Sequence, residues 1–409
     1  PPRAFQSPMS WTLMSGDGER YFDVRFIDEA GNEATERARV VVDTAPPKIA
    51  HQPVTLVDQH AAISITADVT DAAPVVVRLH YRPGGRAAYI PTEMSGDGTY
   101  HASISAFDAS LGVAYYVEAE DALGAVTTFP ADGEASAIGV AVRGRFAQDD
   151  ALQPYAWHMF SVPFSATASN LTSEFDRLLG KDHWQADRWA PRVAANERAV
   201  PVAELSEAFW LVASSPIQVD LDGVLSGPAD PREIRLQAGW NSVANPFSFP
   251  VAFGGVEVRT PDGPARLGSV EAGVYVRPRF WVWNDATSNN VTDGAYQMVT
   301  SLSASWEPWA GYWVFAEEPA TILVHPTPQS SPPLPSPTVD TPIWSATASL
   351  IAERSASRVT LALADDAQWG YDAMDAEQPP APTLTTLALI QADTRYQRLT
   401  LPAGADEWS

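Results

Sequence analysis

Short stretches in which apolar and polar residues alternate recur along most of this chain. AISITADV (62–69) places Ile63, Ile65, Ala67 and Val69 on one face of an extended strand, and VVVRLHYR (75–82) repeats the pattern. Gly, Pro, Asp and Asn bound these stretches, and 35 prolines argue against long helices. Seven or eight such strands fall between residues 46 and 143, so we predict one immunoglobulin-like β-sandwich over 46–145.

The region upstream, 1–45, carries turn motifs in a fixed order. They are W-x-L, G-D-G, D-x-A-G-N and D-T-x-P-P, and the matching residues are Trp11, Leu13, Gly16-Asp17-Gly18, Asp28, Ala30, Gly31, Asn32 and Asp43 to Pro47. This region resembles bacterial extracellular immunoglobulin-like repeats, and the next module resembles fibronectin type III domains more loosely. The resemblance implies that 1–45 is the C-terminal part of such a module, and that the chain begins inside a longer protein.

Met-Ser-Gly-Asp-Gly occurs twice, beginning at Met14 and at Met94. Each copy is followed by a D-x-x-G turn, and Asp-Gly is a preferred tight-turn pair because Gly accepts positive φ. We therefore interpret both copies as a shared hairpin, with calcium binding as the alternative.

A second duplication covers the region 150–326, which contains ten of the fourteen tryptophans. WHMFSVPF (157–164) matches WNSVANPF (240–247), and AFWLVASSPIQVDL (208–221) aligns without gaps to GYWVFAEEPATILV (311–324). Two equivalent β-rich halves, about 155–225 and 238–326, suggest one pseudo-symmetric domain. SNLTSEFDRLLG is the exception: it predicts a helix capped by Asn170 or Thr172 and ended by Gly180.

Residues 327–342 are rich in proline and predict an extended linker, and strands resume in a partial domain at 343–409. The complete expectation is an all-β fold: tandem β-sandwich modules, a duplicated Trp-rich β domain, and at most one or two short helices. GWN, NPF and GYWV, at 239–241, 245–247 and 311–314, resemble a segment of large secreted proteins of Bacteroidota-like bacteria that use type IX secretion. That resemblance implies an extracellular or cell-surface location.

Charge and missing residue types narrow the classes of function. The net charge is −24, which disfavours nucleic acid and anionic lipid as partners. Cysteine is absent, so disulfides and thiolate metal sites are excluded. Apolar runs are too short for a membrane helix, and the common hydrolase and phosphate-loop motifs do not occur. We therefore expect a protein that is not an enzyme.

Two kinds of binding site stay open. Oxygen ligands for calcium could come from Asp372 and Asp375, or from Asp17 and Asp97 in the repeated turns, with Asp28 and Asp121 in similar turns. None of these has the dense spacing of a calcium loop, and tight turns explain Asp-Gly equally well.

Aromatic side chains suggest a carbohydrate platform, because exposed indole faces stack on sugar rings. The candidates are Trp306 and Trp309, where the first half has Ala203 and Ser206, and Trp281 and Trp283 in the expanded second half. Trp at alternate strand positions is more often part of the core.

From these observations we expect a non-catalytic fragment of a secreted or surface-attached protein, acting as a stalk, adhesion or assembly module. One alternative is a carbohydrate-binding accessory region of a secreted hydrolase, with polysaccharide as partner. The other is a protomer of a filament or surface layer, pairing with copies of itself or with other surface proteins through edge strands.

Overall fold

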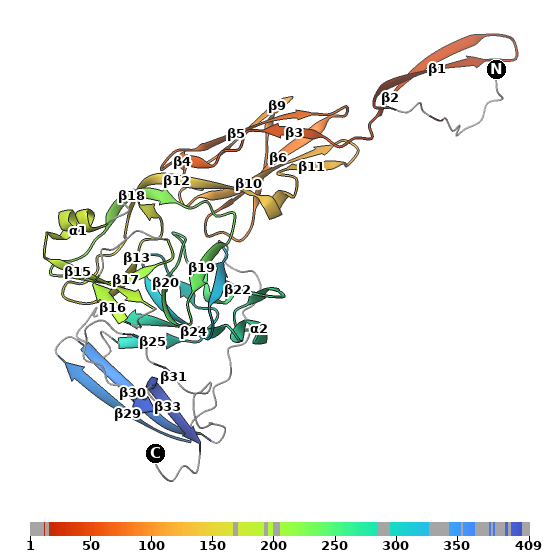
Figure 1. Cartoon of the computed structure of the whole chain (residues 1–409). Helices are drawn as coiled ribbons and strands as arrows, with labels where there is room; N and C mark the ends of the chain where they lie inside the picture. Colours follow the sequence, from red (N-terminus) through yellow and green to blue (C-terminus); the bar gives the residue numbers. More distant parts are fainter. Residues whose placement is uncertain are drawn as a thin grey trace.

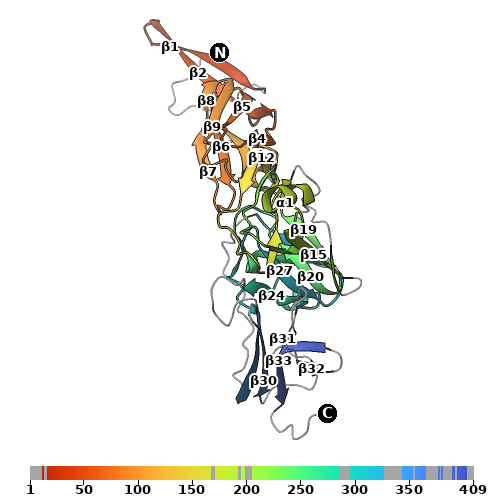
Figure 2. The same ribbon diagram turned by 90° about the vertical axis from the view of Figure 1, so that its left-hand side faces the viewer.

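The computed structural model describes residues 12, 16–166, 171–191, 195–198, 205–284, 295–326, 343–352, 355–364, 376–377, 379–380, 389–391 and 394–402. These residues form several β-sheets with two short α-helices, so the predicted all-β class is confirmed. Four units follow one another, and both views place the N-terminal hairpin and the C-terminal sheet at opposite ends (Figures 1 and 2). The proline-rich stretch 327–342 lies outside the described residues.

The N-terminal unit is a two-stranded hairpin of β1 (Gly18–Ile27) and β2 (Glu33–Val42). In its turn, the carboxylate of Asp28 accepts hydrogen bonds from the backbone N–H and the side-chain amide of Asn32, both at 2.8 Å. One face carries cross-strand ion pairs such as Arg37–Asp23 at 2.7 Å. The opposite face exposes apolar side chains, among them Phe26.

The second unit is a sandwich of two sheets around one core. One sheet has the order β3-β5-β9-β8; the other runs β7-β6-β10-β12, with β11 beside β10 and β4 beside β12. The four residues predicted to share a face of β5 are all at most 3% exposed, so this prediction is confirmed. The strands are β3 (Lys48–His51), β4 (Leu56–Asp58), β5 (Ile63–Thr70), β6 (Val75–Pro83), β7 (Ile90–Glu93), β8 (Ser95–Asp97), β9 (Thr99–Ile104), β10 (Val113–Asp121), β11 (Val126–Phe129) and β12 (Ile138–Ala147), with a 3-10 turn at Gly133–Ser136.

The third unit contains the two Trp-rich halves. The sheet β13-β17-β15-β16 of the first half has the same order of elements as β20-β27-β24-β25 of the second. The first half has β13 (His158–Ser161), β14 (Ser165–Ala166), β15 (Trp184–Ala190), β16 (Ala195–Arg198), β17 (Ala208–Ala213) and β18 (Asp220–Leu225). The second has β19 (Arg232–Leu236), β20 (Gly239–Ala244), β21 (Val251–Ala252), β22 (Glu257–Thr260), β23 (Gly263–Arg266), β24 (Val276–Asn284), β25 (Ala295–Val299), β26 (Ser305–Trp306), β27 (Gly311–Ala316) and β28 (Ala320–Val324), with a 3-10 turn at Phe253–Gly255.

The helices are α1 (Thr172–Leu179) and α2 (Val270–Gly273). The sequence predicts α1, and its buried Phe175 and Leu179 and its C-cap Gly180 agree with that prediction. The predicted cap is wrong for Thr172, which is the first helical residue, and Asn170 lies outside the described residues. The short α2 is not anticipated from the sequence; the Ser269 hydroxyl caps it by accepting the Ala272 N–H.

Strand β12 belongs to two units at once. Its first residues pair with β10 inside the sandwich, whereas Val142 to Ala147 pair with β18 of the Trp-rich domain. In the second half, β19 pairs with β28 in the same way, so the end of β12 serves as the first strand of the first half. The two modules therefore share a continuous, backbone-bonded sheet.

The C-terminal unit is a five-stranded sheet of order β29-β30-β33-β31, with β32 beside β33. It contacts the Trp-rich domain where the Tyr296 hydroxyl donates a hydrogen bond to the Pro380 carbonyl. The strands are β29 (Trp344–Ala352), β30 (Ser355–Ala364), β31 (Ala376–Glu377), β32 (Leu389–Gln391) and β33 (Thr394–Pro402).

Candidate functional site

Three carboxylates meet at the end of the sandwich that faces the N-terminal hairpin. Asp43 follows β2, Asp71 follows β5, and Asp121 ends β10. One carboxylate oxygen from each lies within 4.8 Å of the others, and Asp121 is only 6% exposed. The three residues come from segments far apart in sequence, so only folding brings them together.

Backbone N–H groups hold each carboxylate in place. Asp121 Oδ1 accepts from Leu123 and Ala125 at 2.8 and 2.9 Å, which shapes its D-x-x-G turn. Asp43 Oδ2 accepts from Ala73 at 3.1 Å and therefore ties the inter-module linker to the sandwich.

Asp71 is the electrostatically costly member of the cluster. Its Oδ2 is buried without a hydrogen-bond partner, while Oδ1 accepts from Ala72 at 2.7 Å. Burial, followed by the charges of Asp43 and Asp121, raises the pKa of Asp71. Close carboxylates of this kind either retain a proton or supply oxygen ligands to a hard cation such as calcium. Among the described residues, this is the group of acidic side chains that could hold a metal ion.

Of the predicted metal ligands that the structure describes, Asp17 and Asp97 belong to no shared group of acidic side chains. Asp17 Oδ1 accepts hydrogen bonds from the N–H and hydroxyl of Thr44, at 2.9 and 2.7 Å, and so fastens the start of β1 to the linker. Asp97 lies exposed at the turn between β8 and β9, where Gly98 has φ +76°. Asp372 and Asp375 lie outside the described residues.

The structure describes the second Met-Ser-Gly-Asp-Gly in full and the first only from Gly16 onward. The second copy forms the β8–β9 hairpin, with Met94 in the core. Met14 and Ser15 lie outside the described residues, and the remainder of the first copy leads into β1.

Sequence reasoning listed Asp121 but missed Asp43 and Asp71 as its neighbours. Asp43 belongs to the D-T-A-P-P boundary motif, and this position between modules is the one signal that pointed to it.

The proposed sugar-stacking tryptophans are mostly interior, which corrects that expectation. Trp306, Trp281 and Trp283 are 0%, 2% and 7% exposed, so their ring faces are covered by protein. Trp309 is half-buried, packed against Phe160 and Phe164. These rings fill cores, because a Trp on the inner side of a strand buries more apolar area than any other residue.

Equivalent tryptophans make reciprocal contacts between the halves. The Trp189 indole N–H donates to the Trp240 carbonyl at 2.7 Å, and the Trp283 indole N–H donates to the Trp157 carbonyl at the same distance. Trp240 and Trp157 occupy matching positions in the duplicated sequence.

Edge-to-face ring pairs repeat the same exchange. The ring centres of Trp189 and Trp313 lie 5.3 Å apart, and those of Trp283 and Trp210 lie 5.1 Å apart. The two halves are thus locked by a shared aromatic cluster with approximate two-fold symmetry.

In the part of the chain that the structure describes, no helix combines the length and apolar character needed to span a bilayer.

No protein-family model matches the sequence, and no curated protein matches it. Two solved structures align over much of the chain. A tetra-tandem repeat in the extending region of a large adhesion protein is 10% identical, with 76% of this chain and 82% of that chain covered and a TM-score of 0.23. The FN1–FN3 domains of chicken CNTN1 are 12% identical, with 51% and 72% covered and a TM-score of 0.18. Alignments at these scores establish no shared fold or function.

Proposed function

We propose that this chain is a non-catalytic segment of an extracellular or surface-attached protein, and that its role is that of a stiff structural spacer in a stalk or adhesion region. The observation that carries this proposal is the sharing of β12 between two modules. A flexible linker would let neighbouring modules reorient, whereas a shared sheet resists bending through backbone hydrogen bonds and a packed core.

A second layer of contacts supports the junction around Pro228. Arg82, 5% exposed, donates from Nη2 to the Pro228 carbonyl at 3.0 Å. The backbones of Gly139 and Gly227 approach so closely that a Cβ on Gly227 would lie 2.7 Å from the Gly139 carbonyl carbon. Only glycine allows this approach without a shift of one module against the other.

Ion pairs reinforce the same seam on its exposed side. The Arg145–Asp220 pair, at 2.9 Å, joins β12 to β18 across the junction, and the Arg143–Asp58 pair, at 2.7 Å, joins β12 to β4 within the sandwich. Exposed pairs contribute little free energy, but they favour a single register.

Stretching single molecules that are held near residues 46 and 326, on either side of the two modules, tests the proposal. If the two modules share a strand, the junction between them should not extend before one of the modules unfolds. Each force peak should then release the contour length of a whole module. An extension at low force that precedes every unfolding peak would show that the junction is a hinge, and the proposed role would be wrong.

A further inference from the structure

Ser206 and Trp309 occupy equivalent positions in the two halves but carry very different side chains. Both have left-handed backbone conformations, with φ of +74° and +67°. Their carbonyls accept equivalent hydrogen bonds: Ala244 N–H donates to Ser206 at 3.0 Å, and Ser161 N–H donates to Trp309 at 3.0 Å. The backbone is thus the same at both positions, and only the side chain differs.

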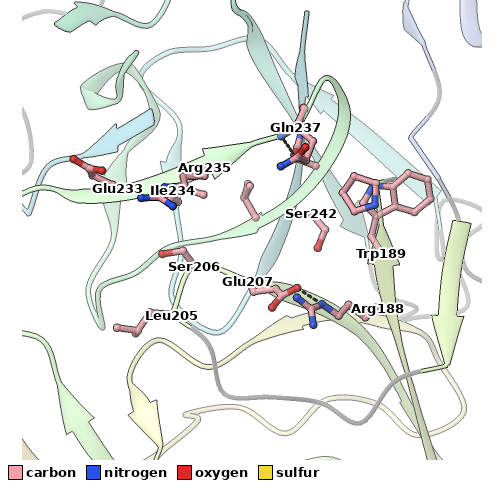
Figure 3. Close-up of a pocket in the computed structure, with 13 residues that line it drawn as sticks. Arg188, Trp189, Leu205, Ser206, Glu207, Glu233, Ile234, Arg235, Gln237 and Ser242 are labelled. Atoms are coloured by element: carbon pink, nitrogen blue, oxygen red, sulfur yellow. Dashed lines mark hydrogen bonds and ion pairs between the residues drawn. The ribbon is translucent and has the colours of Figure 1, made fainter. Parts of the chain in front are cut away.

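In one half, the Trp309 indole fills the space beside this loop. Its ring centre lies 5.9 Å from that of Phe160 and 5.5 Å from that of Phe164. The duplicated sequence places Val243 and Phe247 at the matching positions of the other half. There Ser206 supplies no ring, and a cavity of about 510 Å³ is lined by Ser206 and Val243 among other residues (Figure 3). The cavity therefore borders the position that the symmetry of the domain assigns to an aromatic ring, on the side of Ser206 and Val243, while Phe247 is not part of its lining.

The lining of the cavity is rich in hydrogen-bonding groups. Glu207 is paired with Arg188, and Glu233 is paired with Arg259. The Arg235 guanidinium is exposed and takes part in no ion pair or side-chain hydrogen bond among the described residues. Gln237 adds a side-chain amide, whereas the Asn241 amide and the Ser242 hydroxyl already bond to backbone groups.

From this we infer a binding site for a neutral hydroxylated ring, that is, one or two units of a neutral sugar. The volume is within the range of small-ligand pockets. Sugar hydroxyls both donate and accept, which matches carboxylates, amides and a guanidinium fork arranged around one space. A charge of −24 on the chain repels an anionic sugar at long range, so the neutral class is favoured. This inference goes beyond the structural role, and its failure would leave that role intact.

The test is saturation-transfer NMR and calorimetry on the whole chain, with cellobiose, maltose and lactose as probes and glucuronate as the charged comparison. At least one neutral disaccharide should bind at millimolar concentration. Ser206→Trp, which inserts the side chain that the other half uses at the same φ, should weaken binding at least tenfold without lowering the melting temperature. Arg235→Gln, at an exposed position that folding does not depend on, should weaken binding several-fold. Val270→Ser, at an exposed residue on α2, is the matched control and should leave binding unchanged.

Three results would overturn the inference. One is the absence of binding by all three neutral disaccharides at tens of millimolar. Another is undiminished binding by Ser206→Trp and Arg235→Gln. The third is competition in which N-acetyl-tryptophanamide displaces the sugar and binds more tightly, which would assign the cavity to an aromatic side chain of a protein partner.

Discussion

Val140 and Val142 stand two residues apart on the same face of β12 and belong to two different hydrophobic cores. Val140, fully buried, packs in the sandwich core, and Val142, 1% exposed, packs in the core of the first Trp-rich half. Alternate residues of a strand share a face, so the same face of β12 contributes to both cores within two residues. The boundary between the modules therefore passes through a strand rather than through a linker.

Val142→Ala should destabilise the Trp-rich domain by about 2 kcal/mol, because it leaves a cavity in a packed core. Residues 46–147 contain no tryptophan and ten of the fourteen tryptophans lie in the Trp-rich domain, so tryptophan fluorescence during urea unfolding reports mainly on that domain and not on the sandwich. Val140→Ala removes the same atoms from the sandwich side of the strand. If the shared sheet couples the two modules, Val140→Ala should also lower the urea concentration at the midpoint of the fluorescence transition. An unchanged midpoint would mean that the modules unfold independently.

Trp189→Phe should lower the free energy of unfolding by at least about 1 kcal/mol, because the hydrogen bond to the Trp240 carbonyl is lost along with ring contacts. Trp283→Phe removes the equivalent bond and should have an effect of similar size. Trp344, 49% exposed in the C-terminal sheet, offers the control, and Trp344→Phe should change the melting temperature little. Clearly unequal effects of the first two substitutions would argue against equivalent halves.

The carboxylate cluster should make stability depend on pH in a defined direction. Because the pKa of Asp71 is raised in the folded chain, the folded state retains a proton that the unfolded state has lost. Stability therefore falls as pH rises from the ordinary aspartate pKa near 4 through the raised value, and the cost is complete above that value. Asp71→Asn should raise the melting temperature at pH 7 and flatten this slope. Asp262→Asn, at an exposed position, should do neither; a fall in stability with Asp71→Asn at pH 7 would contradict the account.

Calcium should offset the same repulsion. If Asp43, Asp71 and Asp121 supply ligands to a cation, calcium will raise the melting temperature by binding only the folded state, and a chelator will reverse the gain. The gain should vanish in Asp121→Asn and persist in Asp97→Asn, which alters the exposed hairpin turn. If the melting temperature is the same with calcium and with chelator, the three carboxylates do not bind calcium.

Local pattern was enough to predict the strands, but not the contacts between distant ones. The alternation in β5 identified its buried face, because the side-chain period of a strand is two. The same logic left two positions open for Trp306 and Trp281, since an indole on a strand face is compatible with solvent or core until its partners are known. The pairing of β12 with β18 joins residues about 75 positions apart, and no local signal specifies it.

The carboxylate site shows the same limit. The D-x-x-G turn motif identified Asp121 as a candidate ligand. The sequence around Asp43 indicates a module boundary, and that around Asp71 indicates an ordinary loop. Only the packing of β2, β5 and β10 ends brings the three together. By contrast, the sequence duplication was sufficient to match Ser206 with Trp309. That match relates the cavity beside Ser206 to the Trp309 ring in the other half.

The most direct measurement of the central claim is the distance distribution between the sandwich and the Trp-rich domain. The chain has no cysteine, so spin labels on Leu123→Cys and Val270→Cys, at exposed positions in the two modules, are the only labels present. Pulsed electron–electron double resonance should give a distance distribution between these two labels that is narrow. Its width should match that of a reference pair within the sandwich, Phe107→Cys and Leu123→Cys. Adding Gly227→Val should broaden or shift the distribution by forcing the junction apart, and Gly273→Ala, where an added Cβ meets open space, should not. A broad distribution in the otherwise unaltered chain would contradict the rigid junction and the spacer role built on it.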